Sequence, residues 1–189
     1  MPKVTQEHLE ARRAEILDGA RRAFAEHGYE GATVARLEEA TGLSRGAIFH
    51  YFENKADLFV ELAIEMSTRF TDLIFESGLH EAFRALTAES PEWLAVLIET
   101  EGRLRHDEDF VRRFEAKSAD VTPRVREWFE QQQAEGNLRA DISSVELGRF
   151  TTSLLNGLAL RVAGGDPFEI DAMLRLLDDA IAPRRRRAS

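Results

Sequence analysis

The sequence predicts an all-α fold, and three observations lead to this prediction. Apolar residues recur at spacings of three and four along most of the chain, which is the period of one helix face. Serine, threonine or asparagine precedes several of these runs, as helix N-caps do. Glycine and proline occupy short breaks between the runs, where they end one helix or begin the next.

The segment from Thr33 to Gly42 has the pattern of a short helix. Val34, Leu37 and Ala40 recur at helical spacing, and Thr33 precedes them as a hydroxyl cap. Gly42 follows at the point where a chain that leaves a helix adopts φ > 0. We therefore expect a helix that starts at Thr33 and is ended by Gly42.

A further short helix starts at Ser44, which is placed to cap it. Within this helix Ile48 and Phe52 face inward, so the other face is left for a partner. That face carries Arg45, Phe49, His50 and Tyr51. Two short helices joined by a glycine turn form a helix-turn-helix, and an exposed helix with basic and aromatic side chains fits the major groove of B-DNA.

The next helix opens with an arrangement that suits a phosphate group. Asn54 and Asp57 form a cap-like Asn-x-x-Asp pair around its first turn. Lys55 adds a positive charge beside the unpaired backbone N–H groups of that turn. We expect this end of the helix to contact the DNA backbone.

Several short motifs between Ala20 and Phe59 carry a family resemblance. They are Ala23-Phe24, His27-Gly28-Tyr29, Ala32-Thr33-Val34, Gly42-Leu43-Ser44-Arg45-Gly46-Ala47-Ile48, His50-Tyr51-Phe52 through Lys55, and Leu58-Phe59. With this spacing the segment resembles the DNA-binding domain of the TetR family. Within that family, Met1 to Phe59 looks most like actinobacterial aconitase-repressor-type regulators, and the resemblance weakens after Phe75.

The resemblance implies a three-helix DNA-binding domain, followed by a larger helical domain that dimerises and senses a ligand. We expect the DNA-binding domain at residues 1–54, the regulatory and dimerisation domain at 55–183, and a basic tail at 184–189. The resemblance implies that Arg45 and Ala47 read bases and that Thr33, Tyr51 and Lys55 hold phosphates. The residues expected to contact DNA are Thr33, Arg36, Ser44, Arg45, Gly46, Ala47, Phe49, His50, Tyr51 and Lys55.

Phe49 departs from the family pattern, in which tyrosine is frequent at this position. The missing hydroxyl removes one phosphate contact. Phe49 is therefore either a contact to a thymine methyl group or a partly buried residue.

Beyond Asn54 the chain is predicted to form a helical bundle with short connections. Breaks are expected at Gly78, at Ser90-Pro91, at 106–109 and at Gly136-Asn137. Helices are expected over residues 55–75, from Pro91 onward, over 110–133 with a kink or split at Pro123, over 143–163, and over 167–181.

The last two predicted helices carry more apolar surface than one core needs, so part of it is expected to meet a second subunit. A twofold dimer places two recognition helices about 34 Å apart, which is one turn of DNA. The residues expected at this interface are Phe150, Leu154, Leu158, Met173 and Leu177.

The resemblance also implies a ligand pocket in the C-terminal bundle. Asn156 and Arg161 interrupt an otherwise apolar helix, and a buried polar group needs a partner, either a ligand or the other subunit. Glu99 and Arg103 lie four residues apart, as in a ligand clamp or an ordinary salt bridge. The aconitase-repressor likeness implies a carboxylate-rich metabolite such as citrate. The candidate ligand-binding residues are Trp93, Glu99, Arg103, Trp128, Gln132, Asn156, Arg161 and Asp178.

Composition argues against other classes of protein. There is no cysteine, the five histidines are scattered, and no phosphate loop, metal motif or nucleophile elbow occurs, so we expect neither an enzyme nor a metal or cofactor. No stretch approaches the roughly 20 apolar residues of a membrane span, and the N-terminus lacks the apolar region of a signal peptide. We expect a cytoplasmic protein.

The charge balance favours an alternative function. The net charge is -9, and the first sixty residues hold eight Lys or Arg against ten Asp or Glu, whereas DNA-binding surfaces are usually basic. The alternative is a helical protein-interaction module that has lost DNA binding. Under the DNA-binding hypothesis Lys3, Arg12, Arg13, Arg36, Arg45 and Lys55 share one face, and Glu38, Glu39 and Glu53 lie on others.

Overall fold

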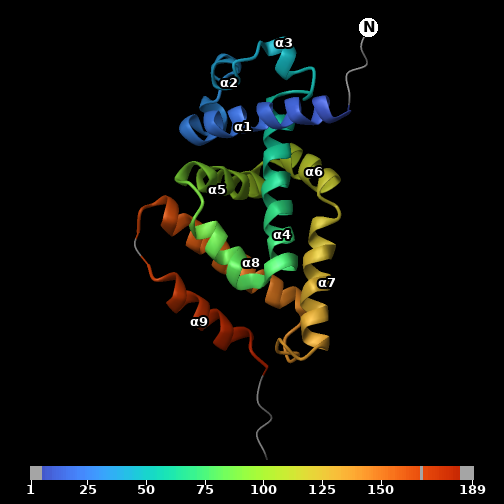
Figure 1. The fold of residues 1–189 in the computed structure, drawn as a ribbon, viewed down its shortest axis with the longest axis vertical. Coiled ribbons are helices and arrows are strands. Elements are labelled where there is room, and N and C mark those ends of the chain that lie inside the picture. The colour runs from blue at the N-terminus through green and yellow to red at the C-terminus, as the bar shows by residue number, and fades with distance from the viewer. Residues whose placement is uncertain (1–5, 167, 184–189) are drawn as a thin grey trace, which may run out of the picture. The chain divides into compact units, whose positions relative to one another are not determined.

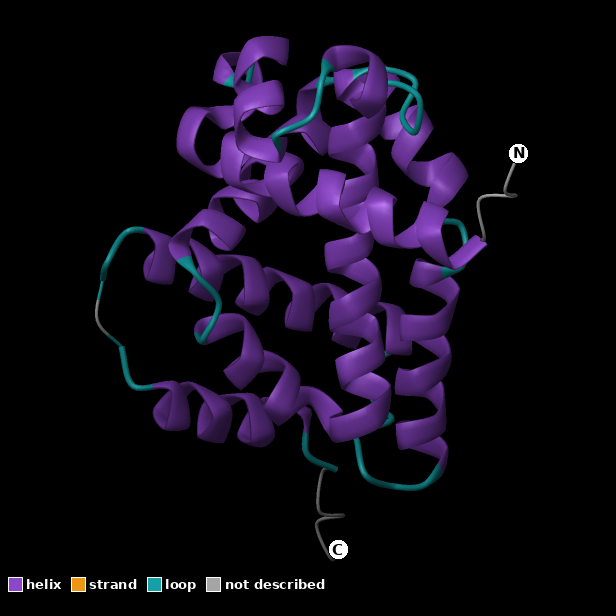
Figure 2. Cartoon of the chain, turned by 45° about the horizontal axis from the view of Figure 1, so that its top comes forward, coloured by secondary structure: helices purple, strands orange, loops and turns teal. Residues whose placement is uncertain are grey.

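Helices joined by short loops form the whole chain over residues 6–166 and 168–183, the residues that the computed structural model describes, and no strand occurs among them (Figures 1 and 2). The prediction of an all-α fold is confirmed. The chain divides into two compact units. The first unit contains residues 1–66 and 90–117, and the second contains residues 67–89 and 118–189. The expected basic tail at 184–189 lies outside the described residues.

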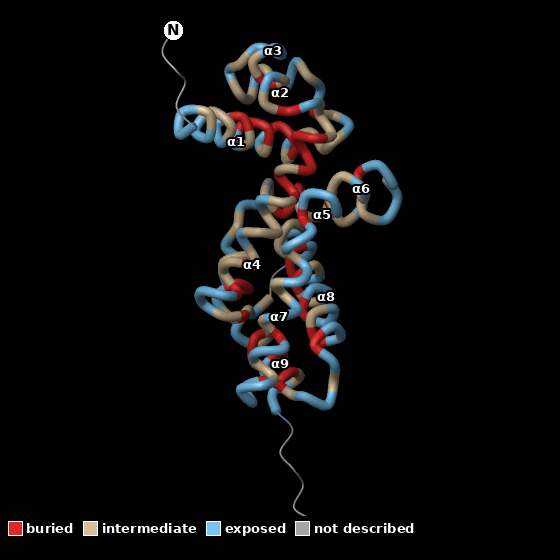
Figure 3. The backbone as a smooth tube through the Cα atoms, turned by 90° about the vertical axis from the view of Figure 1, so that its right-hand side faces the viewer, coloured by how far each residue is buried: buried red, intermediate tan, exposed pale blue. Residues whose placement is uncertain are grey.

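The first unit is built around a long N-terminal helix. Helix α1 packs against α2 and α5, α2 packs against α3, and α5 packs against α6 (Figure 1). Buried side chains from these helices and from the start of α4 form one apolar cluster, and Figure 3 shows the buried positions of α1 in red. The bounds are α1 Gln6–Gly31, α2 Val34–Thr41, α3 Arg45–Ile48, α4 Lys55–Thr87, α5 Pro91–His106 and α6 Glu108–Lys117.

Helices α1 and α2 approach each other at Gly19. A Cβ atom on Gly19 would lie 2.7 Å from Thr41 Cγ2, 2.8 Å from Thr41 Cα and 2.9 Å from the carbonyl oxygen of Ala40. Two of these three atoms belong to the backbone, which cannot move aside as a flexible side chain can. Glycine at position 19 therefore sets how closely α2 lies on α1.

The second unit contains the remainder of α4, with α7 Val121–Ala134, α8 Ser144–Ala163 and α9 Ile170–Ile181. Helix α7 packs against α8. Gly78 bends α4 with φ 81°, as its predicted role as a break requires. The core of this unit includes Ile74, Phe83, Phe129, Leu147, Leu155, Leu158, Leu174, Leu177 and Ile181.

Most predicted helix ends agree with the structure, and two differ. Ser90, in the predicted break before Pro91, is the N-cap of α5, and Ser143, the predicted first residue of a helix, is the N-cap of α8. The helix expected over 110–133 is split, as one of the two predicted outcomes, but the break lies at residues 118–120 and not at Pro123, which is in the first turn of α7, where a proline costs no hydrogen bond. The last helix begins at Ile170, three residues later than expected.

The compact units do not coincide with the boundary expected after residue 54. The apolar cluster of the first unit includes Leu58, Phe59 and Leu62 from α4, together with Val96 from α5 and Phe110 from α6. These side chains cover the apolar face of α1 and so belong with it. In the part of the chain that the structure describes, no helix is long and apolar enough to cross a membrane.

Candidate nucleic-acid interface

Local hydrogen bonds define the predicted helix-turn-helix. The Thr33 hydroxyl accepts from the N–H of Arg36 at 3.4 Å, and the Ser44 hydroxyl accepts from the N–H of Ala47 at 3.4 Å, so both predicted caps are present. Gly42 has φ 68° and ends α2, as expected. The buried Ile48 attaches α3 to the core. The next residues form a turn, so the regular part of the recognition helix is shorter than predicted.

The side chains that were expected to face DNA divide into two groups. Thr33, Arg36, Ser44, Arg45, Gly46 and His50 are exposed. Ala47, Phe49, Tyr51 and Lys55 are partly buried. Phe49 and Tyr51 pack against the apolar cluster of the first unit. Of the two alternatives for Phe49, the structure therefore shows partial burial.

The cations that follow α1 differ from the cations on α1 in whether a carboxylate balances their charge. Among the Lys and Arg side chains described up to residue 60, only Arg36, Arg45 and Lys55 have no carboxylate within ion-pair distance. The paired cations are Arg12 with Glu15, Arg13 with Glu61, Arg21 with Glu65 and Asp18, and Arg22 with Asp18. Arg12 and Arg13 were expected to share the DNA-facing surface, but their charges are neutralised inside the chain. Lys3 lies outside the described residues.

Arg36 and Lys55 are held by backbone carbonyl groups. Arg36 Nη1 donates to the Gly31 carbonyl at 2.8 Å, and Lys55 Nζ donates to the Tyr29 carbonyl at 2.8 Å. Lys55 Nζ also lies 4.3 Å from the centre of the Tyr29 ring. Each cation keeps its full charge and further N–H donors, because a carbonyl group takes only one of them. In the part of the chain that the structure describes, the Arg45 guanidinium has neither an ion pair nor a hydrogen bond.

Glu38 lies closer to the recognition helix than expected. The sequence predicted its side chain on a different face from Arg45. In the structure, Glu38 Oε1 accepts a hydrogen bond from the backbone N–H of Arg45 at 2.6 Å. Sequence reasoning missed this contact because seven residues and a turn separate the two positions. The one sequence signal for this contact was the presence of an acidic residue in the helix that precedes the recognition helix.

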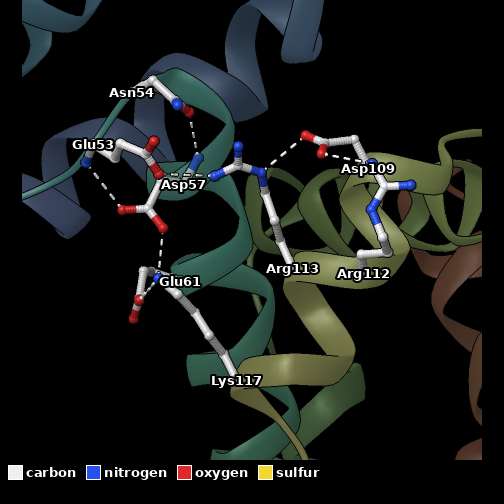
Figure 4. A network of polar contacts seen from close by, with 8 residues as sticks. All are labelled: Glu53, Asn54, Asp57, Glu61, Asp109, Arg112, Arg113 and Lys117. Carbon is white, nitrogen blue, oxygen red and sulfur yellow. Dashed lines mark hydrogen bonds and ion pairs between the residues drawn. The ribbon is translucent and has the colours of Figure 1, made fainter.

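A polar network holds the turn that follows the recognition helix (Figure 4). Asn54 Oδ1 accepts from the N–H of Asp57 at 2.9 Å, and Asp57 Oδ2 accepts from the N–H of Glu53 at 3.1 Å, which confirms the predicted Asn-x-x-Asp cap. Lys117 of α6 donates to both Asp57 and Glu61. Arg113 of α6 donates to Glu53 at 3.0 Å, so Glu53, which was expected to lie away from the DNA-facing surface, is paired with a cation of α6.

This network shifts the pKa of two of its members. Burial by itself raises the pKa of Asp57, but hydrogen bonds from Lys117 and from the Glu53 N–H, and the charges of Lys117 and Arg113, outweigh it and lower the pKa below its ordinary value. Burial lowers the pKa of Lys117, but its bonds to Asp57 and Glu61 outweigh this and raise it. The pair is therefore charged across the range from mild acid to mild alkali.

We expect Asp57→Asn to destabilise the chain at pH 7 by about 1 to 2 kcal/mol, because it removes a charged hydrogen-bond partner of Lys117. Since the folded pKa of Asp57 is lowered, its contribution is present above the unfolded pKa of about 3.9 and is lost as pH falls through the folded value. The difference in unfolding free energy from the original chain should therefore shrink below about pH 4. Urea unfolding at several pH values measures it.

The exposed Asp179 of α9, which has no ion pair in the described part of the chain, provides the matched control. Asp179→Asn should leave stability close to that of the original chain at every pH. A difference for Asp57→Asn that stays constant from pH 7 to pH 2 would contradict the assigned role of the carboxylate.

The candidate ligand residues are distributed over both units. Trp93, Glu99 and Arg103 belong to the first unit, and Trp128, Gln132, Asn156, Arg161 and Asp178 belong to the second. Arg103 lies with its guanidinium carbon 3.3 Å from the centre of the Tyr29 ring and pairs with Glu30, Glu99 and Asp107. Arg103 thus joins α5 to the end of α1.

In the second unit, Arg161 and Asp178 are exposed, whereas Gln132 and Asn156 are partly buried. The Arg161 side chain is 59% exposed and pairs with Asp166, which corrects the expectation that it needs a buried partner. Asp178 is 53% exposed and contacts His80 at 2.7 Å. Trp128 packs against the core of its unit, and Gln132 accepts from Asn137.

The candidate dimer residues fall on both sides of their helices. Leu158 and Leu177 are 3% and 1% exposed and belong to the core of the second unit, which corrects their expected position on a surface. Leu154 and Met173 are partly buried, and Phe150 is exposed. The structure adds Val145, Leu160 and Leu176 as exposed apolar residues of α8 and α9. Helical spacing alone could not tell the inward leucines from the outward ones.

Sequence comparisons match both units. A sequence profile described as "Bacterial regulatory proteins, tetR family" matches residues 16–62, and one described as "BetI-type transcriptional repressor, C-terminal" matches residues 76–184. The chain is 41% identical over 184 residues to the HTH-type transcriptional repressor Rv1474c of Mycobacterium tuberculosis, covering 96% of this chain and 98% of the relative. It is also 41% identical to the HTH-type transcriptional repressor AcnR of Corynebacterium diphtheriae, covering 96% and 97%.

These matches continue beyond Phe75, where the resemblance was expected to weaken, and extend through α9. Solved structures agree on the fold. Salmonella enterica GusR has a TM-score of 0.75 at 20% identity and covers 94% of this chain and 98% of its own. A structure from Saccharomonospora viridis in complex with choline has a TM-score of 0.65 at 21% identity and covers 93% and 99%.

Proposed function

This chain belongs to the TetR family of bacterial regulatory proteins, and on that premise we propose that it is a dimeric, sequence-specific repressor released by a small molecule bound in its C-terminal helices. Its full-length relatives are transcriptional repressors and not enzymes. The predicted subgroup, the aconitase-repressor type, is confirmed by relatives that carry the name AcnR.

The observation that carries the proposal is the placement of Arg45. Its backbone begins α3 and is fixed by Glu38, the nearby Ile48 is buried in the core, and its guanidinium is exposed without a partner in the described structure. An arginine on a rigid support can donate two parallel hydrogen bonds to guanine. Arg36 and Lys55, the other two cations without a carboxylate, supply charge for phosphates.

Binding to DNA tests this proposal against the alternative of an interaction module. Fluorescence anisotropy would compare the DNA flanking the gene with a random-sequence duplex as the salt concentration rises. We expect a preference for one flanking sequence and a steep loss of affinity with salt. No preference at any salt, together with no enriched sequence after selection from a random pool, would overturn the DNA-reading function.

The dimer is supported by the exposed apolar residues of α8 and α9. Phe150 and Leu160 lie on one side of α8 with Gly157 between them, and the Leu160 side chain is 59% exposed. Leu176 on α9 is 61% exposed. Surfaces of this kind are typical of contacts between subunits.

We expect Phe150→Asp to convert a dimer into monomers at micromolar concentration, because a charge would be buried in the interface. Sedimentation equilibrium measures the change, and operator affinity should fall with it because one half-site is lost. Phe75→Asp is the control: Phe75 is equally exposed, at 43%, but lies on α4 with Arg124 over its ring. A Phe150→Asp chain that remains dimeric would contradict this interface.

The effector that the subgroup implies is a carboxylate-rich metabolite such as citrate. Similarity to the AcnR relatives includes the second unit, and a protein of the same fold holds choline, which supports binding of a small molecule by the helical body. Adding citrate to the operator complex should release the DNA. An operator complex unaffected by citrate would remove this class of effector.

A further inference from the structure

Glu38 links the two helices of the helix-turn-helix. Its side-chain Oε1 accepts from the N–H of Arg45 at 2.6 Å, and its backbone carbonyl accepts from the N–H of Gly42 at 2.9 Å. Both the turn and the first residue of α3 are therefore attached to one residue of α2. This contact is the shorter of the two side-chain bonds to the start of α3, since Ser44 accepts from Ala47 at 3.4 Å.

The charge of Glu38 is not balanced by a cation. No Lys, Arg or His side chain lies within ion-pair distance of its carboxylate among the residues that the structure describes. The negative charge stands beside the backbone of the arginine that faces outward. A carboxylate at this place repels the phosphates of any DNA that approaches Arg45.

We infer that Glu38 is a specificity-determining residue, which positions Arg45 and penalises DNA on which Arg45 finds no matching base. This inference rests on the proposed DNA-reading function. A fixed backbone at Arg45 limits the base edges that its guanidinium can reach. The second carboxylate oxygen has no partner in the described structure and can accept from a base amino group, such as N4 of cytosine.

Complexes with matching DNA and with other DNA therefore differ in how the negative charge of Glu38 is compensated. On a matching sequence, contacts from Arg45 and from a base amino group offset the repulsion. On any other sequence the repulsion remains, and affinity is lowered. The carboxylate should thus widen the ratio between operator affinity and random-sequence affinity, at some cost in total affinity.

Three variants separate positioning from charge. Glu38→Gln keeps an oxygen that accepts from the Arg45 N–H and removes only the charge, whereas Glu38→Ala removes both. Glu39→Gln is the control, because Glu39 is the exposed neighbour on α2 and its side chain makes no hydrogen bond or ion pair within the described chain. The probes are an operator duplex selected with the original chain from a random pool and a random-sequence duplex.

We expect Glu38→Gln to bind the random duplex about three- to tenfold more tightly at low salt, with the gain disappearing as salt screens the charge. Its operator affinity should rise less, so the specificity ratio falls. Glu38→Ala should also lose about fivefold in operator affinity relative to Glu38→Gln, because the cap on Arg45 is gone. Glu39→Gln should change both affinities by the same factor.

Two results would overturn the inference. One is a Glu38→Gln chain whose affinities for both duplexes rise equally, as in the Glu39→Gln control. The other is a Glu38→Ala chain that binds the operator as tightly as Glu38→Gln. Circular dichroism would show that each variant is folded. An original chain without any preference between the duplexes would instead overturn the DNA-reading function, and this inference with it.

Discussion

Arg45→Ala is expected to lower operator affinity about 10- to 100-fold and to relax base preference at one position of each half-site. The reason is that Arg45 is the exposed cation without an internal partner at the start of α3, and its guanidinium is the group that can pair with guanine. Anisotropy titrations against the operator and against duplexes with single base-pair changes measure both effects. The lost discrimination should be confined to one base pair.

Two comparisons make this result specific. Arg105→Ala removes another exposed arginine that has no ion pair in the described part of the first unit, but it lies on α5, so operator affinity should stay the same. Lys55→Ala should weaken binding to all sequences alike, because it removes a phosphate contact. If Arg45→Ala also lost affinity equally on every duplex, Arg45 would not be a base-reading residue.

Gly19→Ala is expected to destabilise the first unit by about 1 to 3 kcal/mol. The new methyl group would lie 2.7 to 2.9 Å from Thr41 and from the Ala40 carbonyl, so α2 must move away from α1. Because α2 carries the cap that fixes α3, operator affinity should fall in the same variant. Urea unfolding followed by circular dichroism measures the stability.

Gly102→Ala is the matched control. Gly102 also lies inside a helix of the first unit, but apart from the backbone of its own helix turn no atom lies within 4 Å of the place where its Cβ would stand. Alanine there should stabilise the chain by up to about 1 kcal/mol, since glycine is the poorer helix former. If Gly19→Ala instead raised the free energy of unfolding as Gly102→Ala does, the close approach of α1 and α2 would not require glycine at position 19.

Features that depend on neighbouring residues could be predicted from the sequence. Thr33, Ser44 and Asn54 cap helices as their positions indicated, and Gly42 ends α2 with the expected positive φ. These structures form from hydrogen bonds across three or four residues, so the residue type and its place before a helical run are sufficient. The family resemblance, which was inferred from the same segment, was confirmed by the similarity to known repressors.

Features that depend on packing could not be predicted in this way. Leu158 and Leu154 occupy similar positions in the pattern of α8, but Leu158 is in the core and Leu154 is only partly buried. The bond from Glu38 to Arg45 and the bonds of Lys117 to Asp57 join residues that are distant in sequence. Their partners depend on how helices meet, which single-sequence periodicity does not contain.

Helix α4 supplies side chains to two separate cores, and this limits how the DNA-binding segment can be exchanged between proteins. A fragment that ends at residue 54 lacks Phe59 and Leu62, which complete the first core, as well as α5 and α6. Recombination at that point would join an incomplete core to a foreign one. The preference for an operator sequence is therefore changed more readily by single substitutions on the exposed surface of α3 than by replacing residues 1–54 with those of a relative.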